Sequence, residues 1–142
     1  MPIFVSILII IIIFVILLDR FIAHMYRNPQ KSHQATPMEY NIAYEEVRIP
    51  LSKQSQLYGW WISASPNAPT IILVHGWGRN LSRMLQYIVH LYPLSYNLLA
   101  FDARNHGSSS SEKHPTVGTF SEDTLAAINF IAKSGLVSSS DF

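Results

Sequence analysis

The sequence predicts an α/β domain that follows one membrane-spanning helix. The first observation is an apolar run, IFVSILIIIIIFVILL, over residues 3–18, which only Ser6 interrupts. The second is a series of strand, helix, strand and helix patterns between residues 70 and 135, which is typical of right-handed βαβ units. We therefore expect about four strands and two crossover helices, preceded by one transmembrane helix.

The apolar run is the strongest compositional signal in the chain. Residues 3–18 give roughly 24 Å of helix, and extension to Ala23 gives about 31 Å, against a hydrocarbon core of ~30 Å. Residues 3–23 can therefore span a lipid bilayer, which is the partner we predict for them. A cleaved signal peptide is the alternative, but no Lys or Arg precedes the run and no A-x-A-like site follows it.

The orientation of this anchor is predicted from its flanking charges. Arg20, Arg27 and Lys31 all follow the run, and no basic residue precedes it. Because basic residues favour the cytoplasmic side, we expect a single-pass N-terminal anchor whose soluble part lies in the cytoplasm.

Composition excludes several kinds of partner. The chain has 10 Lys and Arg against 9 Asp and Glu, a net charge of +1 without a basic stripe, so no nucleic-acid partner is predicted. It has no cysteine, so disulfides and thiolate metal sites are excluded. The phosphate-binding pattern G-x-x-x-x-G-K-[ST] is absent, and Gly76-Trp77-Gly78 lacks the third glycine of G-x-G-x-x-G. We predict no cofactor and no metal.

Three parts are expected along the chain. Residues 1–26 form the transmembrane anchor and its flank. Residues 27–40, RNPQKSHQATPMEY, are polar with two prolines and no apolar period, and so read as a linker. Residues 41–142 form the α/β domain.

The domain begins with two β-rich runs. EEVRIPL (45–51) and LYGWWIS (57–63) predict a hairpin or meander at a sheet edge, with Trp60 and Trp61 covering the two faces of the sheet. TIILVHG (70–76) is the near-continuous apolar run of a strand that helices bury on both faces.

A helix, a strand, a loop and a second helix follow. Asn80 can cap the first helix, which ends before Pro93; its apolar positions are Leu81, Met84, Leu85, Ile88 and Leu91. YNLLAFDAR (96–104) is the next strand, and a long polar loop with four serines, most simply a flexible one, follows it. Thr119-x-x-Glu122 resembles a capping box for the second helix, which Gly135 ends; its expected apolar face is Leu125, Ile128 and Ile131 or Ala132.

Two motifs fall at the expected carboxyl ends of strands, where ligands bind in parallel α/β sheets: HGWGRN (75–80) and DARNHGSSS (102–110). A glycine-rich turn there can direct backbone N–H groups at an oxyanion, at about 3 kcal/mol per donor. Together the motifs ILVHGWG and AFDARNHGSSS resemble the α/β-hydrolase fold family, in particular its serine hydrolases related to esterases, lipases and S33-type peptidases. The resemblance covers about residues 41–142, the N-terminal portion of such a domain, and Asn105 stands where the family usually has glycine.

The resemblance implies a role for several residues. The backbone N–H of Trp77 becomes one oxyanion-hole donor, and Gly76 and Gly78 permit the turn. His75 matches a motif histidine that more often braces loops than transfers protons. The family's usual strand order is one, two, four, three, five. Two further residues, Asp102 and Arg104, are expected to hold the loop after the fourth strand through hydrogen bonds and a local ion pair.

No catalytic residue is predicted in this chain. The family's triad runs Ser, then Asp or Glu, then His, with the serine in a G-x-S-x-G elbow, and no such elbow occurs in the 142 residues. All six histidines would precede such an elbow: His24, His33, His75, His90, His106 and His114. Nucleophile, acid and histidine are therefore expected beyond Phe142.

The sequence thus predicts the N-terminal part of a membrane-anchored serine hydrolase that is inactive alone. Once completed, the enzyme would cleave an ester, thioester or amide of a small-molecule or peptide acyl substrate. The alternative is a non-catalytic, membrane-anchored remnant or binding protein.

Overall fold

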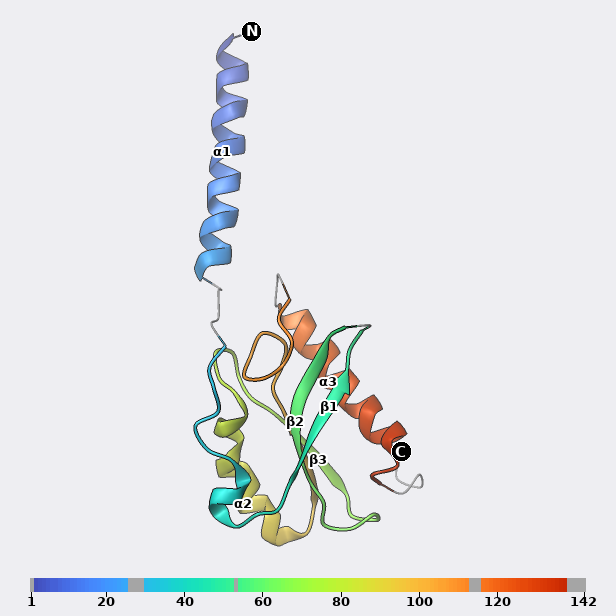
Figure 1. Cartoon of the computed structure of the whole chain (residues 1–142). Coiled ribbons are helices and arrows are strands. Elements are labelled where there is room, and N and C mark those ends of the chain that lie inside the picture. Colours follow the sequence, from blue (N-terminus) through green and yellow to red (C-terminus); the bar gives the residue numbers. More distant parts are fainter. Residues whose placement is uncertain (1, 26–29, 53, 113–115, 138–142) are drawn as a thin grey trace.

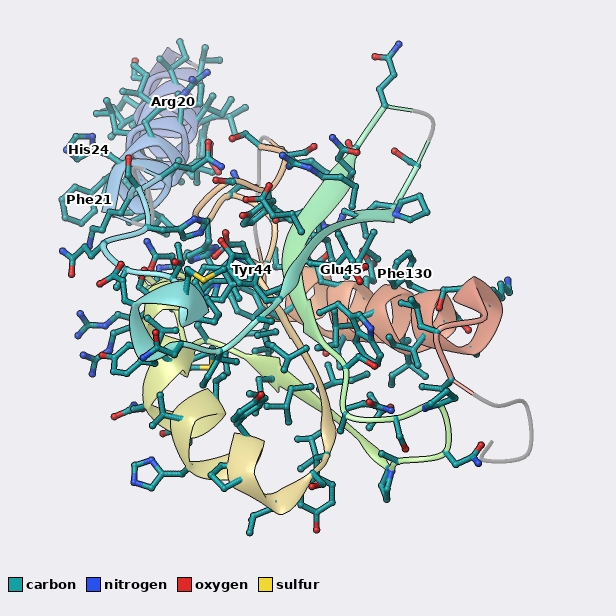
Figure 2. The ribbon with its side chains drawn as sticks, turned by 60° about the horizontal axis from the view of Figure 1, so that its bottom comes forward. Arg20, Phe21, His24, Tyr44, Glu45 and Phe130 are labelled. Carbon is teal, nitrogen blue, oxygen red and sulfur yellow. The ribbon has the colours of Figure 1, made fainter. Side chains whose placement is uncertain are left out.

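A computed structural model describes residues 2–25, 30–52, 54–112 and 116–137. One long helix, α1 (Pro2–Met25), stands outside the domain formed by the rest of the described chain (Figure 1). Its segment Ile3–His24 has a mean hydropathy of 2.9 and no part buried in the protein. The helix is long and apolar enough to cross a membrane, a property that an N-terminal signal sequence shares. Figure 2 shows Phe21 and His24 projecting outward near its C-terminal end.

Four strands form one mixed sheet: β1 (Glu45–Pro50), β2 (Gln56–Ile62), β3 (Thr70–Val74) and β4 (Asn97–Phe101). Their spatial order is β1-β2-β4-β3. β2 pairs antiparallel with both β1 and β4, whereas β3 and β4 are parallel. The edge hairpin and the strand order one, two, four, three are both confirmed.

The two adjacent tryptophans of β2 divide the core between the two faces of the sheet. Trp60 packs on the face that Ile88 of the first crossover helix covers, and Tyr44 lies edge-on to it at 5.6 Å between ring centroids. Trp61 packs on the opposite face with Ile131 of the second helix. Both tryptophans are buried, and they lie on opposite faces because successive side chains alternate along a strand.

The first crossover helix forms as expected, in two parts. A 3-10 turn, η2 (Leu81–Met84), leads into α2 (Leu85–Leu91), and a further turn, η3 (Tyr92–Leu94), contains Pro93. The side chain of Asn80 accepts a hydrogen bond from the backbone N–H of Ser82 at 3.2 Å, which confirms it as the cap.

The second helix, α3 (Val117–Ser134), differs from expectation in its start and its face. Thr116, not Thr119, is the N-cap, because Thr116 and Thr119 exchange capping hydrogen bonds. Gly135 ends the helix with a φ of 68°, as expected. The buried positions are Asp123, Ala127 and Ile131. Two residues of the predicted face, Leu125 and Ile128, are 59% and 41% exposed.

The physical reason is a buried polar residue on α3. Asp123 has no exposed surface and pairs with Arg104, so the helix turns this side toward the sheet. Positions 123, 127 and 131 lie one turn apart on one face, and the leucine and isoleucine between them then face outward. Apolar periodicity alone could not detect a face set by a carboxylate.

The segment just after α1 lies against the domain. Residues 30–36, here called the strap, hydrogen bond to the loops after β3 and β4, and the short turn η1 (Pro37–Tyr40) leads from the strap into β1. Residues 26–29 of the expected flank and linker lie outside the described residues. The boundary at residue 41 stays a prediction.

Candidate active site

Three segments meet at the carboxyl ends of β3 and β4: residues 75–80, residues 102–112 and the strap. The first two loops are fixed to each other by a reciprocal pair of histidines. His75, after β3, accepts through Nε2 from the backbone N–H of Ala103 at 3.2 Å. His106, after β4, accepts through Nε2 from the backbone N–H of Gly78 at 3.1 Å. Each loop thus supplies a ring to the other, with the ring centroids 4.9 Å apart.

The hydrogen bonds also fix the tautomer of both rings. Nδ1 of His75 lies 2.9 Å from the carbonyl of Gly76, and Nδ1 of His106 lies 2.8 Å from the carbonyl of Arg104. A carbonyl only accepts and a backbone N–H only donates, so each ring carries its proton on Nδ1. Burial lowers the pKa of His75, which favours the neutral ring. Both histidines therefore brace the loops and have no lone pair free for a substrate proton.

Asp102 is the hub of the edge. Its carboxylate is fully buried and accepts from the backbone N–H of Leu81 at 2.8 Å and that of Ser108 at 2.9 Å. Nε2 of His33, in the strap, lies 2.6 Å from the same Oδ2 that Ser108 contacts. Gly107 packs against this carboxylate at a φ of 47°, and a Cβ there would overlap it. One side chain therefore ties the strap, the start of η2 and the loop after β4 together.

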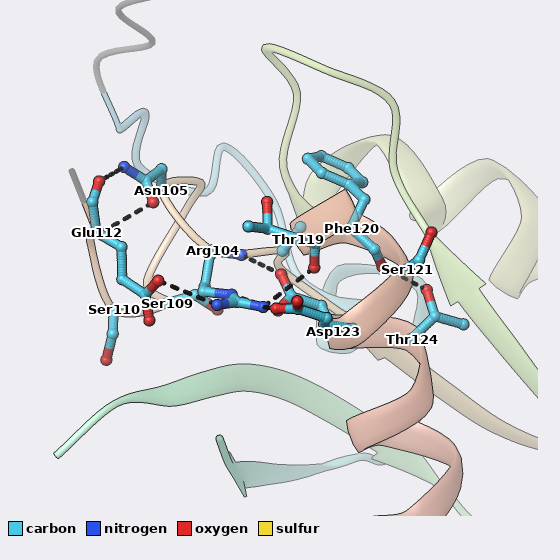
Figure 3. A network of polar contacts seen from close by, with 12 residues as sticks. Arg104, Asn105, Ser109, Ser110, Glu112, Thr119, Phe120, Ser121, Asp123 and Thr124 are labelled. Atoms are coloured by element: carbon cyan, nitrogen blue, oxygen red, sulfur yellow. Dashed lines mark hydrogen bonds and ion pairs between the residues drawn. The ribbon is translucent and has the colours of Figure 1, made fainter. Parts of the chain in front are cut away.

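Arg104, two residues later, fixes α3 to the same loop (Figure 3). Its guanidinium pairs with three carboxylates: Asp123 at 2.6 Å, Glu122 at 2.6 Å and Glu112 at 3.0 Å. Burial opposes its charge, but the hydrogen bonds that it donates to Glu122 and Asp123 outweigh burial and raise its pKa. The ion pairs that hold this loop therefore join Arg104 to α3 and Glu112. No pair between Arg104 and Asp102 occurs among the described residues.

Asn105 explains why its position in the motif usually holds glycine. Its φ is 64°, in the left-handed region that Asn tolerates better than most residues. Its side chain also accepts from the backbone N–H of Glu112 at 3.0 Å and donates to the carbonyl of the same residue (Figure 3). The asparagine thus keeps the turn and adds a brace across the loop.

The serine run is an ordered part of the site, contrary to the expectation of a flexible loop. Ser109 is buried and bridges two strands: it donates to the carbonyl of Asp102 at 2.5 Å and accepts from the backbone N–H of Tyr58 at 2.8 Å. Ser110 accepts from the backbone N–H of Gln56, and Ser111 donates to Gln30. The serine hydroxyls thus connect β2 to the loop after β4, alongside backbone hydrogen bonds between the same two segments.

The glycine-rich turn depends on one of its two glycines. Gly78 has a φ of 72°, whereas Gly76 has no positive φ and has open space where a Cβ would stand. Between them Trp77 is 41% exposed, stacks on Phe120 at 5.8 Å and meets His106 edge-on at 5.4 Å. The role of the Trp77 backbone N–H as an oxyanion donor stays a prediction.

Sequence reasoning missed the strap. Nε2 of Gln30 donates to the carbonyl of Ser109 at 2.6 Å, and Nζ of Lys31 to that of Gly78 at 3.3 Å. Asn80, predicted only as a cap, donates to the carbonyls of Lys31 and Ser32. The ring of His33 also stacks on Tyr58 at 5.2 Å. No local pattern predicts these hydrogen bonds, because their partners lie 47 to 79 residues away.

Two of the remaining histidines lie away from this edge, and a third is not described. His90 bonds the carbonyl of Gln86 within α2, His24 lies on α1, and His114 lies outside the described residues, as does Phe142. Among the residues that the structure describes, no group of three or more His, Cys, Asp or Glu side chains could hold a metal ion.

Solved structures with this arrangement identify the fold. An esterase, Pf2001 of Pyrococcus furiosus, aligns with a TM-score of 0.63 at 28% identity, over 78% of this chain and 45% of its own. The α/β hydrolase GrgF from a Penicillium species aligns at 0.61 and 20% identity, over 70% of this chain and 35% of its own. The domain has the α/β-hydrolase fold. As the alignments cover less than half of these neighbours, it accounts for only part of such a fold, consistent with the N-terminal portion.

Sequence comparison also matches the chain to less than half of a longer protein. The chain is 30% identical over 131 residues to YfhR of Salmonella typhimurium, an uncharacterized protein, covering 88% of this chain and 43% of that one. No protein-family model matches the chain. The chain thus spans less than half the length of the relatives it matches.

Proposed function

We propose that this chain is the N-terminal part of a membrane-anchored serine hydrolase that cleaves an ester, thioester or amide. The observation that carries the proposal is the reciprocal histidine brace. It fixes the glycine turn at the carboxyl end of β3, next to the strand-end crevice of the α/β-hydrolase fold, with its backbone rigidly placed. The fold likeness to an esterase supports the same reaction class.

We assign different catalytic roles to this chain and to the part that would complete the domain. This part contributes the turn whose Trp77 N–H would face the oxyanion, and His75 and His106 brace the two loops. The nucleophile, the acid and the catalytic histidine would come from the segment that completes the sheet beyond β3. The chain alone would then have no hydrolase activity.

The anchor is part of the proposal. α1 would cross the bilayer, with the strap and the domain on the cytoplasmic side. Its support is the length and hydropathy of Ile3–His24, together with the basic residues that follow the apolar run.

A chimera tests the function: this chain continued by the remaining part of YfhR, compared with the chain alone. We expect a fluorophosphonate probe to label the chimera and not the chain. In the chimera Trp77→Phe should keep most activity on p-nitrophenyl esters, whereas Trp77→Pro, which lacks the N–H, should lose on the order of a hundredfold in kcat.

Three outcomes would contradict the proposal. They are stoichiometric labelling of the chain alone, a folded chimera that neither labels nor hydrolyses, and equal activity of the two Trp77 variants. The second outcome would favour a binding protein, and the third would place the oxyanion hole elsewhere.

A further inference from the structure

The strap restricts how the domain can sit relative to α1. Four residues separate Met25, the last residue of α1, from Gln30, the first of the strap. At about 3.3–3.6 Å per residue, their Cα atoms are at most about 18 Å apart, whatever course the chain takes between them. Gln30 is held on the loop after β4 by the carbonyl of Ser109 and the hydroxyl of Ser111.

The hydrogen bonds of Gln30, Lys31 and His33 attach the strap at the carboxyl ends of β3 and β4. Lys31 binds the carbonyl of Gly78 in the glycine turn, and His33 binds Asp102 beneath it. Each contact joins the strap to a loop at the carboxyl end of β3 or β4. If α1 ends at the surface of a bilayer, this edge lies within one short tether of that surface.

The side chains on the same edge suit a membrane surface. Trp77 is 41% exposed beside the turn, and Val117, at the start of α3, is 85% exposed. Exposed Lys31 and Arg79 flank the turn. Tryptophan partitions to the membrane interface, and anionic lipid headgroups attract basic side chains near it.

We propose that the carboxyl edge of the sheet faces the bilayer, and that the acyl substrate is an ester embedded in that bilayer. The occupant of the exposed edge is therefore lipid, and the substrate reaches the glycine turn from the membrane side without crossing the aqueous phase. The substrate class rests on the proposed function, whereas the orientation of the edge does not.

Single cysteines test the orientation, since the chain contains none of its own. Val117→Cys places an environment-sensitive NBD label on the proposed face. The matched control is Leu94→Cys, an exposed apolar position, 62% exposed, in η3 at the opposite end of β4. The full chain is reconstituted in vesicles of phosphatidylcholine and anionic phosphatidylserine, washed with carbonate, and titrated with lipid brominated along the acyl chain.

We expect bromolipid to quench the label at Val117 at least threefold more than the label at Leu94. Equal quenching, or stronger quenching at Leu94, in protein that stays in the membrane pellet would overturn the orientation. A far-ultraviolet circular dichroism spectrum equal to that of the unlabelled chain shows that both labelled proteins are folded. Release by the carbonate wash would refute the anchor, and with it the inference.

A second arm tests the substrate class with the chimera. A long-chain fluorogenic ester is placed either in the same vesicles as the protein or in separate ones, and rates are normalised to a water-soluble short-chain ester. We expect at least tenfold faster hydrolysis in the same vesicles, and equal rates would overturn the membrane-embedded substrate. Hydrolysis of the soluble ester would show that the chimera is an active hydrolase, so equal rates on the long-chain ester would contradict only the membrane-embedded substrate.

Discussion

Asp102 and Arg104 stand two residues apart on one loop, yet they hold the site edge in opposite ways. The Asp102 carboxylate is stabilised chiefly by backbone N–H groups, from Leu81 and Ser108, and by His33. Arg104 is stabilised by full charges, three carboxylates of which Asp123 alone is completely buried. Asp102 reaches partners up to 69 residues away, whereas the partners of Arg104 lie within 19.

The difference separates two tasks. Asp102 gathers segments distant in sequence, including the strap, and a close glycine is needed to make room for it. Arg104 docks the first turns of α3 on its own loop and binds Glu112 within that loop. Both side chains are buried, so each requires a complete set of partners. A bulkier neighbour would disrupt the contacts of Asp102, whereas loss of the positive charge would disrupt those of Arg104.

Replacement of Arg104 should give the largest effect. Arg104→Ala leaves the buried Asp123 carboxylate without its cation, and we expect a loss of about 3–5 kcal/mol in the free energy of unfolding. Urea unfolding of the full chain in detergent micelles, followed by the fluorescence of buried Trp60 and Trp61, measures it.

The exposed partner of Arg104 supplies the control. Glu122 is 66% exposed, so Glu122→Gln should cost at most about 1 kcal/mol. Arg104→Lys, which keeps the charge but loses the planar fork, should fall between the two. If Glu122→Gln lost as much free energy of unfolding as Arg104→Ala, burial would not determine how much each ion pair contributes to stability.

Gly107 tests the other centre by shape. In Gly107→Ala the new Cβ meets the Asp102 carboxylate and also has to adopt a positive φ, so we expect a loss of about 2–5 kcal/mol. Gly135→Ala is the matched control, because Gly135 also has a positive φ but has open space around a Cβ. It should lose only about 1–2 kcal/mol in the same unfolding assay. Equal losses would mean that backbone conformation, and not contact with Asp102, requires the glycine.

Much of the fold could be predicted because its signals are local. The strand patterns, the alternation of Trp60 and Trp61, and the cap at Asn80 each depend on neighbouring residues. The strand order came from the family resemblance, since no local pattern specifies it. The face of α3 was predicted incorrectly, because Asp123 is buried by a partner 19 residues away and outranks the apolar repeat.

The site was only partly predictable for the same reason. The motifs located both loops and suggested a bracing role for His75, because a histidine before a glycine turn is a sequence pattern. The return contact of His106, the bridge made by Ser109 and the strap contacts of His33 depend on chain segments that only folding brings together. A polar, proline-containing stretch reads as a linker unless its partners are known.

The smallest effect we predict is a pH dependence from His75. Burial lowers its pKa in the folded protein, so the unfolded state binds the proton first as pH falls through about 6.5. The contribution of the neutral ring to stability is therefore complete above pH 6.5 and is lost as pH falls below it, at no more than about 1.4 kcal/mol per pH unit. His75→Gln keeps an oxygen that can accept from the N–H of Ala103 but cannot titrate. The free energy of unfolding should therefore fall less steeply between pH 7 and 5 for His75→Gln than for the unaltered chain. The other histidines contribute equally to both slopes, so the difference between the slopes reports His75 alone. Parallel slopes would show that His75 takes up its proton equally in both states, and the brace would then owe its strength to packing against His106 and Phe120 and not to a neutral ring.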